Sequence, residues 1–104
     1  MEKRITTWEE LSKELGTFIS VENAPSRNGC GSAPNQFLLT FENGTVFQSY
    51  STRIGAMIGG KLYLDSRYHD YSNTTSGYVG RWCGYNCSQR RALLASGEII
   101  DILK

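Results

Sequence analysis

The stretch QFLLTFENGTVFQSY, residues 36–50, carries the strongest fold signal in the chain. Two runs rich in aromatic and β-branched residues flank Asn43-Gly44, a dipeptide that favours a two-residue hairpin turn because both residues tolerate positive φ. Large apolar residues of the first run share one face of an extended strand: Phe37, Leu39 and Phe41. The pattern therefore predicts an antiparallel β-hairpin.

Upstream of the hairpin, the sequence predicts one helix, one strand and one loop. Thr7 followed three residues later by Glu10 is a capping-box pattern, and Gly16 supplies a stop, so we expect a helix over residues 8–15. Residues 17–22 (TFISVE) are typical of a strand. Residues 23–36 hold both prolines and predict a long loop, a kind of segment that is often functional or mobile.

Downstream of the hairpin, the segments are shorter and more polar. RIGAMIGG, residues 53–60, is glycine-rich and predicts a turn or a brief helix, and KLYLD, residues 61–65, predicts a strand. A helix capped by Thr74 or Thr75 is expected to end at Gly84.

The last part of the chain predicts a second helix and a closing strand. The helix would be capped by Asn86 or Ser88 and stopped by Gly97, and EIIDIL, residues 98–103, would form the strand. The order of elements predicts one α+β domain spanning residues 1–104. We expect a largely antiparallel sheet of about five strands, an N-terminal helix and two helices in the C-terminal half.

Composition supports an ordinary globular protein. The 104 residues are 39% hydrophobic and 20% charged, which excludes a disordered chain. The sequence has no run of 18 apolar residues and no basic-then-apolar start, so we expect no membrane span and no signal peptide. Three cysteines are a poor disulfide framework and suit a reducing compartment. These features predict a cytoplasmic protein.

Positive charge concentrates in the middle of the chain. Residues 53–91 carry six basic and two acidic side chains, although the whole chain has a net charge of only +1. Arginine accounts for five of the six basic residues. The segment suits contact with phosphates or with acidic protein surfaces, while solvated arginines are the ordinary explanation for such a run.

The chain's single histidine is compatible with two kinds of site chemistry, general-base catalysis and zinc binding. His69-Asp70 has the residue types of a general base and its orienting carboxylate, but adjacent residues of an extended chain point to opposite faces, so Asp65 or another carboxylate would have to orient His69. The sequence contains no G-x-S-x-G, H-E-x-x-H or P-loop motif. We therefore expect no enzyme.

The alternative for the same histidine is zinc. The ligand types of a Cys3His site are present in Cys30, Cys83, Cys87 and His69. The spacing is not that of a C-x2-C knuckle, and free cysteines more often act as small buried apolar side chains. The prediction is no metal and no other cofactor.

Rings and guanidinium groups interleave from residue 50 to residue 91. Such residues stack on the bases of single-stranded nucleic acid and also dominate protein–protein hot spots. We expect Tyr78 and Trp82, on one face of a helix, to be core residues. The candidate binding residues are Tyr50, Arg53, Arg67, Tyr68, His69, Tyr71, Arg81, Arg90 and Arg91.

The stretch LDSRYHDYSNTT, residues 64–75, is rich in side chains that satisfy backbone amides at turns and helix starts: Asp70, Ser72, Asn73, Thr74 and Thr75. It is therefore expected to be the corner where a strand gives way to a helix. A corner of this kind is still able to recognise a partner, so both roles stay open.

Residues 47–84 resemble a small domain found in phage and prophage proteins of unassigned function. The resemblance rests on an F-x-S-Y stretch, a strand ending in Asp65, a D-Y-S-x-T-T corner at residues 70–75 and a helix ending at Gly84, and it extends over about residues 37–100. The family supplies no catalytic residues. The resemblance implies an accessory protein of a mobile element, and such proteins often antagonise host defences by binding.

These observations lead to one functional prediction with two alternatives. We expect a non-enzymatic phage-derived protein in the host cytoplasm that binds and inhibits a host defence factor, such as a CRISPR effector nuclease or its RNA complex. With a net charge of +1 the chain is not a DNA mimic. The alternatives are a single-stranded nucleic-acid-binding module and a protein that binds a small nucleotide signal.

Overall fold

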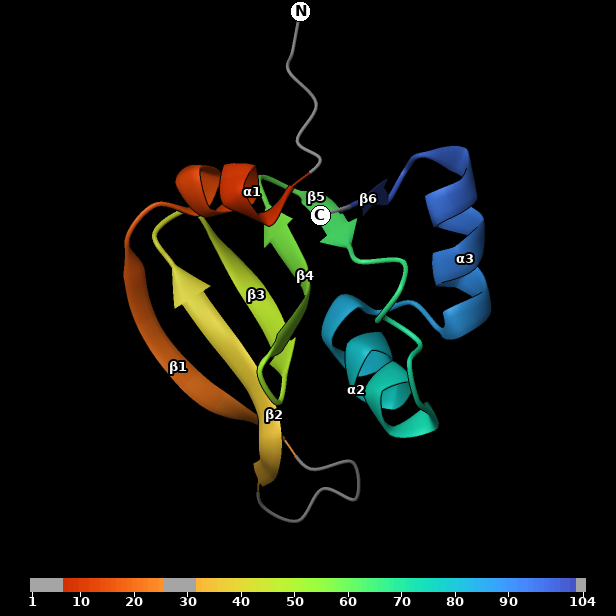
Figure 1. Cartoon of the computed structure of the whole chain (residues 1–104), viewed down its shortest axis with the longest axis horizontal. Helices are drawn as coiled ribbons and strands as arrows, with labels where there is room; N and C mark the ends of the chain where they lie inside the picture. The colour runs from red at the N-terminus through yellow and green to blue at the C-terminus, as the bar shows by residue number, and fades with distance from the viewer. Residues whose placement is uncertain (1–6, 26–31, 103–104) are drawn as a thin grey trace, which may run out of the picture.

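The computed structural model describes residues 7–25 and 32–102 (Figure 1). In these ranges the elements are, in chain order, α1 (Trp8–Leu15), β1 (Phe18–Pro25), β2 (Ser32–Phe41), β3 (Gly44–Ser49), β4 (Thr52–Ile58), β5 (Lys61–Leu64), α2 (Asn73–Cys83), α3 (Cys87–Ser96) and β6 (Ile100–Asp101). The described strands form one sheet in the order β1-β2-β3-β4-β5-β6. Neighbours pair antiparallel except β5 and β6, which are parallel. The predicted α+β class with a largely antiparallel sheet is confirmed.

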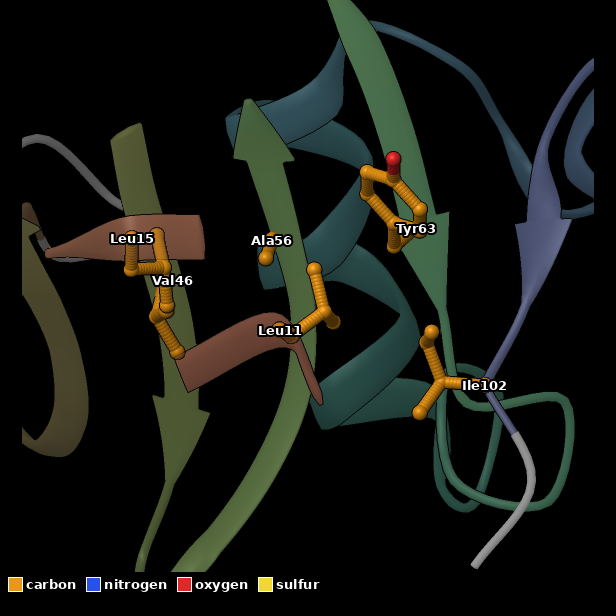
Figure 2. Close-up of a cluster of buried hydrophobic side chains, with 6 residues drawn as sticks. All are labelled: Leu11, Leu15, Val46, Ala56, Tyr63 and Ile102. Atoms are coloured by element: carbon orange, nitrogen blue, oxygen red, sulfur yellow. The ribbon is translucent and has the colours of Figure 1, made fainter. Parts of the chain in front are cut away.

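Both faces of the sheet are covered by helices, and each carries its own apolar cluster. On one face, α1 contributes Leu11 and Leu15 to a cluster that also contains Val46, Ala56, Tyr63 and Ile102 (Figure 2). On the opposite face, α2 and α3 cover a second cluster centred on Phe47, Leu64 and Val79. Trp82 stacks on Phe47 with ring centroids 5.8 Å apart, so the core role predicted for Trp82 is confirmed. The alternation along β3 sends Val46 to the first cluster and Phe47 to the second.

The β2–β3 hairpin is confirmed, but its predicted turn is wrong. Phe41 pairs with Gly44, so the loop is Glu42-Asn43, and neither Asn43 nor Gly44 has a positive φ. Contacts with the end of α1 hold this turn instead: the amide of Asn43 donates to the carbonyl oxygen of Leu15 at 2.9 Å. Gly44 is required for space, because a Cβ there would collide with the carbonyl oxygen of Met57.

Residues 52–58 form strand β4, so the turn or helix predicted for residues 53–60 is wrong. The strand is buried on both faces and therefore lacks the alternation that marks a half-exposed strand. A Cβ on Gly55 would lie 2.6 Å from Leu64 and 3.0 Å from Trp82, so glycine makes room for the core. The two-residue turn with positive φ lies at Gly59-Gly60 (φ 55° and 80°), between β4 and β5.

The long loop predicted for residues 23–36 is wrong at both ends. β1 continues to Pro25 and β2 starts at Ser32, while residues 26–31 lie outside the described residues. Asn23 pairs with Phe37 and Pro25 pairs with Ser32, so backbone pairing overrides the turn-like composition of the segment.

Local capping signals locate the helices well. The side chain of Thr7 accepts a hydrogen bond from the amide of Glu10, and Asn86 forms a reciprocal capping box with Gln89. The predicted cap of α2, Thr74 or Thr75, is wrong. The helix is capped by Ser72, whose hydroxyl accepts a hydrogen bond from the backbone amide of Thr75 at 3.1 Å. In the described ranges, no helix is both long enough and apolar enough to cross a membrane.

Candidate functional site

The corner between β5 and α2, residues 65–72, is fastened by hydrogen bonds. Asp65 is fully buried, and its backbone carbonyl accepts the amides of Tyr68 and His69 at 3.1 and 3.0 Å. Its carboxylate accepts the backbone amide of Arg67 at 2.9 Å, and the amide of Ser66 donates to Asp101 of β6 at 3.1 Å. This packing fixes the backbone that carries Tyr68 and Tyr71, and it confirms the predicted structural role of the corner.

Three tyrosines meet at a pocket of about 320 Å³ between this corner and the β3–β4 turn. We call it the tyrosine pocket, and it is lined by Ser49, Tyr50, Thr52, Ile54, Tyr68, Tyr71, Ser72 and Thr75. The rings of Tyr68 and Tyr71 lie 6.4 Å apart at an interplanar angle of 53°. Every lining side chain is uncharged, and four of them carry aliphatic hydroxyl groups. The pocket therefore combines aromatic surface with hydrogen-bonding groups.

Tyr50 has an unusual backbone in the turn that borders the pocket. Its φ is 54°, and among the described residues no other non-glycine residue has a positive φ. Its amide donates to the carbonyl oxygen of Asn35 at 2.7 Å, and its carbonyl oxygen accepts from the side chain of Gln48 at 2.9 Å. The side chain is nevertheless 64% exposed. The turn thus holds an aromatic ring at the pocket in a conformation that glycine would adopt more easily.

Arg67 lies over the ring of Tyr68, with its guanidinium carbon 5.0 Å from the ring centroid. The same guanidinium donates to both carboxylate oxygens of Asp65, from Nε at 3.0 Å and from a terminal nitrogen at 2.7 Å. The hydrogen bond to Asp65 raises the pKa of Arg67 above its usual value. Arg67 therefore holds the ring of Tyr68 in place, and its charge is already paired.

His69 and Arg90 lie beneath the surface rather than on it. Arg90 is fully buried and donates from Nε to Nδ1 of His69 at 3.0 Å, and its other nitrogens bond the carbonyl oxygen of Tyr85 and the hydroxyl of Ser76 at 2.8 and 2.6 Å. Burial lowers the pKa of His69; the charge of Asp70 opposes that shift, and Arg90 adds to it. Nδ1 is an acceptor here, so the imidazole is neutral. The pair ties α2, α3 and the corner together.

Arg91, the next residue along α3, is mostly exposed and forms an ion pair with Asp70 at 2.7 Å. This hydrogen bond is the main reason that the pKa of Asp70 is lowered. Cys87 also lies 3.7 Å from the same carboxylate. Asp70 therefore pairs with α3 and does not orient His69, in agreement with the sequence argument about adjacent residues.

The remaining two candidate residues do not line the tyrosine pocket. Arg53 donates to the hydroxyl of Ser12 of α1 at 3.4 Å and lies 6.0 Å from the ring centroid of Phe41. It lines a neighbouring pocket of about 310 Å³ that shares Thr52 and Tyr68 with the tyrosine pocket. Arg81 borders a separate, mostly apolar hollow of about 540 Å³ beside Leu38 and Trp82. Of the nine candidate residues, the structure thus brings four together at one site: Tyr50, Arg67, Tyr68 and Tyr71.

The hydroxyl groups of the pocket were not among the predicted site residues. Ser49 and Thr52 flank Tyr50 at the ends of β3 and β4, and Ser72 and Thr75 form the start of α2. The polar run around residues 70–75 pointed to the second pair, but no sequence signal distinguishes Ser49 and Thr52 from ordinary strand ends.

The ligand types of a Cys3His zinc site do not come together in the described residues. Among residues 7–25 and 32–102, no three His, Cys, Asp or Glu side chains gather at one point, and Cys30 lies outside these ranges. Cys83 contacts the carbonyl oxygen of Tyr85, and Nδ1 of His69 is taken by Arg90.

A family of unknown function (DUF8033) matches residues 21–101. The chain belongs to this family. The match begins in β1 and ends in β6, so the tyrosine pocket of this DUF8033 protein lies inside the matched region. A family without an assigned function was expected, and that part of the prediction is confirmed. No curated protein and no solved structure matches the chain.

Proposed function

We propose that this protein is an accessory protein of a phage or other mobile element that binds and inhibits a defence protein of the host, such as a CRISPR effector nuclease. The tyrosine pocket is the proposed recognition site. The origin and the class of target rest on the resemblance of residues 47–84 to small phage-borne domains. The binding role rests on Tyr50, whose exposed ring borders the pocket at a positive φ.

The conformation of Tyr50 supports a role in binding because it lowers stability without filling the core. A left-handed conformation costs a non-glycine residue about 1–2 kcal/mol. A side chain with 64% of its surface exposed recovers little of that energy by burial. Strained residues of this kind cluster at ligand-binding sites. A ring that meets a partner is the role that accounts for a tyrosine in this turn.

The charges around the pocket favour a protein partner over nucleic acid. Of the five arginines between residues 53 and 91, Arg67 and Arg91 are paired with carboxylates, and Arg90 is buried. Nucleic-acid affinity depends on cations that can replace counterions along the phosphate backbone. Tyrosine, in contrast, is among the residues that carry most of the energy of protein interfaces. At about 320 Å³ the pocket is near the lower limit for ligand pockets and suits one inserted side chain.

The test is capture from a bacterial host lysate by immobilised wild-type protein, a Tyr71→Ala variant and a Tyr85→Ala variant. Both tyrosines are exposed, but Tyr85 lies outside the tyrosine pocket and serves as the matched control. We expect wild type and Tyr85→Ala to retain one defence protein in the presence of nuclease, and Tyr71→Ala to lose it. A purified assay of that protein then measures inhibition. Equal capture by all three chains would contradict the assigned site.

The position of Arg67 over the ring of Tyr68 keeps single-stranded nucleic acid as a second candidate, since paired rings and guanidinium groups hold bases by stacking. This function predicts retention of nucleic acid and loss of the captured proteins after nuclease treatment. Affinity would also fall as the salt concentration rises, with a slope set by the number of phosphates neutralised. Because most of the nearby arginines are paired or buried, we expect a shallow slope.

A further inference from the structure

A pocket of about 310 Å³ adjoins the tyrosine pocket and shares Thr52 and Tyr68 with it. We call it the arginine pocket, and its other lining residues are Trp8, Gln48, Ser51, Arg53 and Asp65. Two of these carry a charge, and the carboxylate of Asp65 is already paired with Arg67. Arg53 therefore leaves the arginine pocket with a net positive charge.

A bulge in β4 sets the direction of the Arg53 side chain. Phe47 of β3 pairs with Gly55 of β4. The next residue of β3, Gln48, pairs with Arg53, so Ile54 is an extra residue in β4. Ile54 and Gly55 both face the cluster under α2 and α3, and the extra residue turns Arg53 toward α1 instead. Bulges re-aim side chains in this way next to functional sites.

The guanidinium of Arg53 keeps most of its hydrogen-bonding capacity. Such a group has five N–H donors, and in the described ranges the Arg53 side chain makes one hydrogen bond, to the hydroxyl of Ser12 at 3.4 Å. Its other contact is with the ring of Phe41, whose centroid lies 6.0 Å from the guanidinium carbon. Both of these partners are neutral, whereas Arg67 and Arg91 are each paired with a carboxylate. Arg53 can therefore bind an anionic group without breaking an ion pair.

We propose that the arginine pocket binds a carboxylate, so that the partner segment carries an aspartate or glutamate beside the apolar or aromatic side chain that enters the tyrosine pocket. This assignment rests on the function proposed above, because it describes the partner of the same site. A guanidinium group binds a carboxylate through two parallel hydrogen bonds. A single cation matches a single carboxylate, whereas nucleic acid presents phosphates in series and requires several cations.

The residues shared by the two pockets define how such a segment lies. Thr52 and Tyr68 line both pockets, so a ligand that fills them passes across these two side chains. In an extended segment, side chains two residues apart leave the backbone on the same side. The acidic residue is therefore expected two positions from the inserted side chain, in either direction along the segment.

The proposal is tested by titrating the full chain with two synthetic peptides, acetylated and amidated at their ends, up to about 10 mM, with binding followed by the NMR shifts of backbone amides. The acidic peptide is Asp-Gly-Phe-Gly-Asp, and the neutral peptide is Asn-Gly-Phe-Gly-Asn. We expect wild type to bind the acidic peptide at least about five-fold more tightly, because charge-assisted hydrogen bonds are stronger than neutral ones.

Two variants locate the preference. Arg53→Gln should bind both peptides equally. Lys13→Gln is the matched control, because it removes the same charge at an exposed position of α1 that lines neither pocket, and it should keep the preference of wild type. A preference retained by Arg53→Gln, or lost in Lys13→Gln, would overturn the role of Arg53.

The comparison of the two peptides on wild type does not depend on the folding of Arg53→Gln. Equal binding of both peptides would overturn the carboxylate site and leave the tyrosine pocket as a site for a ring. Binding of neither peptide would overturn the role of the tyrosine pocket in recognition as well. A short oligothymidylate that binds wild type more tightly than the acidic peptide does would assign the anion to nucleic acid and overturn the carboxylate.

Discussion

The corner between β5 and α2 differs sharply between its inner and outer sides. On the inner side, Asp65, His69 and Arg90 are almost fully buried, and each is hydrogen-bonded. On the outer side, Tyr71 is 77% exposed, and Tyr50 reaches the same pocket from the β3–β4 turn. The inner residues hold the backbone in place, while the outer residues present aromatic surface. Stability and recognition are thus assigned to different side chains of one short segment.

The two sides are connected, because the inner hydrogen bonds fix the positions of the outer rings. Tyr68 shows the connection directly: it packs against the apolar cluster around Phe47, lines the tyrosine pocket and lies under the guanidinium of Arg67. A change on the inner side should therefore lower stability first and binding second. A change of an exposed ring on the outer side should lower binding without lowering stability.

The largest effect on stability is expected for Arg90→Ala. The substitution leaves the buried acceptor Nδ1 of His69 without its donor, which costs about 1–3 kcal/mol, and it also removes the part-buried hydrogen bonds to Tyr85 and Ser76. A cavity adds to the loss. We expect the free energy of unfolding to fall by at least about 3 kcal/mol, measured by urea denaturation.

The neighbouring variant Arg91→Ala is the matched control. Its side chain is mostly exposed and pairs with Asp70, and an exposed ion pair contributes little to stability because solvent screens the charges. A loss for Arg91→Ala as large as that for Arg90→Ala would mean that burial does not separate the inner from the outer side of the corner.

Asp65→Asn should have the next largest effect. The side-chain amide of asparagine keeps one of the two oxygen acceptors of Asp65. It replaces the second oxygen with an NH2 donor, which would face a terminal nitrogen of Arg67, itself a donor. We expect a loss of about 1–3 kcal/mol in the free energy of unfolding. Freed from its carboxylate, Arg67 should also become more mobile, which side-chain NMR relaxation can measure. Unchanged relaxation at Arg67 would show that stacking on Tyr68 alone holds it.

His69 should make stability depend on pH in a defined window. Its pKa is lowered in the folded chain, so the unfolded chain takes up the proton first as pH falls below about 6.5. Stability should therefore be constant between pH 7 and 8 and fall below about pH 6.5, by at most about 1.4 kcal/mol per pH unit, until the folded-state pKa is reached.

The variant His69→Gln serves as the control for this window, because an amide oxygen can accept from Arg90 without titrating. The lowered pKa of Asp70 removes stability only at more acidic pH, below about pH 4. The dependence near pH 6 should thus vanish in His69→Gln. If it persists, another group is responsible for it.

Local rules predicted the helices because capping is decided within a few residues. Thr7, Asn86 and the stop glycines Gly16, Gly84 and Gly97 lie where the sequence indicated them. The strand β4 escaped prediction because helices cover both of its faces and remove the period-two alternation. The turn at Glu42-Asn43 depends on backbone contacts with the end of α1, far away in sequence.

The candidate site was only partly predictable for the same reason. Composition pointed to the corner at residues 64–75, and Tyr68 and Tyr71 do line the pocket. The sequence could not predict that Tyr50 lies beside Tyr68 and Tyr71, because this proximity depends on the pairing of β3, β4 and β5. Nor could the sequence predict that Arg90 is buried and Arg91 is exposed, because two adjacent arginines differ only in the direction in which their side chains leave α3.

Tyr50→Gly should have a small effect of the opposite sign. Glycine adopts a φ of 54° without strain, so we expect the variant to be more stable than wild type by about 0.5–1 kcal/mol while binding to the partner is lost. Gly59→Ala is the converse control: a Cβ there meets nothing within 4 Å, so its cost of about 1 kcal/mol would come from the backbone alone. Thermal unfolding measures both. A destabilised Tyr50→Gly would mean that the ring supports the fold.

Tyr71→Ala should have the smallest effect on stability and therefore gives the sharpest test of the outer side. The side chain is 77% exposed, and its ring contacts Tyr68 at a centroid distance of 6.4 Å, so the free energy of unfolding should change by less than about 0.5 kcal/mol. Replacing Arg67 and Tyr68 together would not separate the two roles, because Tyr68 packs into a core cluster and Arg67 pairs with the buried Asp65. Loss of partner binding by Tyr71→Ala at unchanged stability would therefore assign recognition to the exposed rings, whereas a loss of stability would assign Tyr71 to the structural side of the corner.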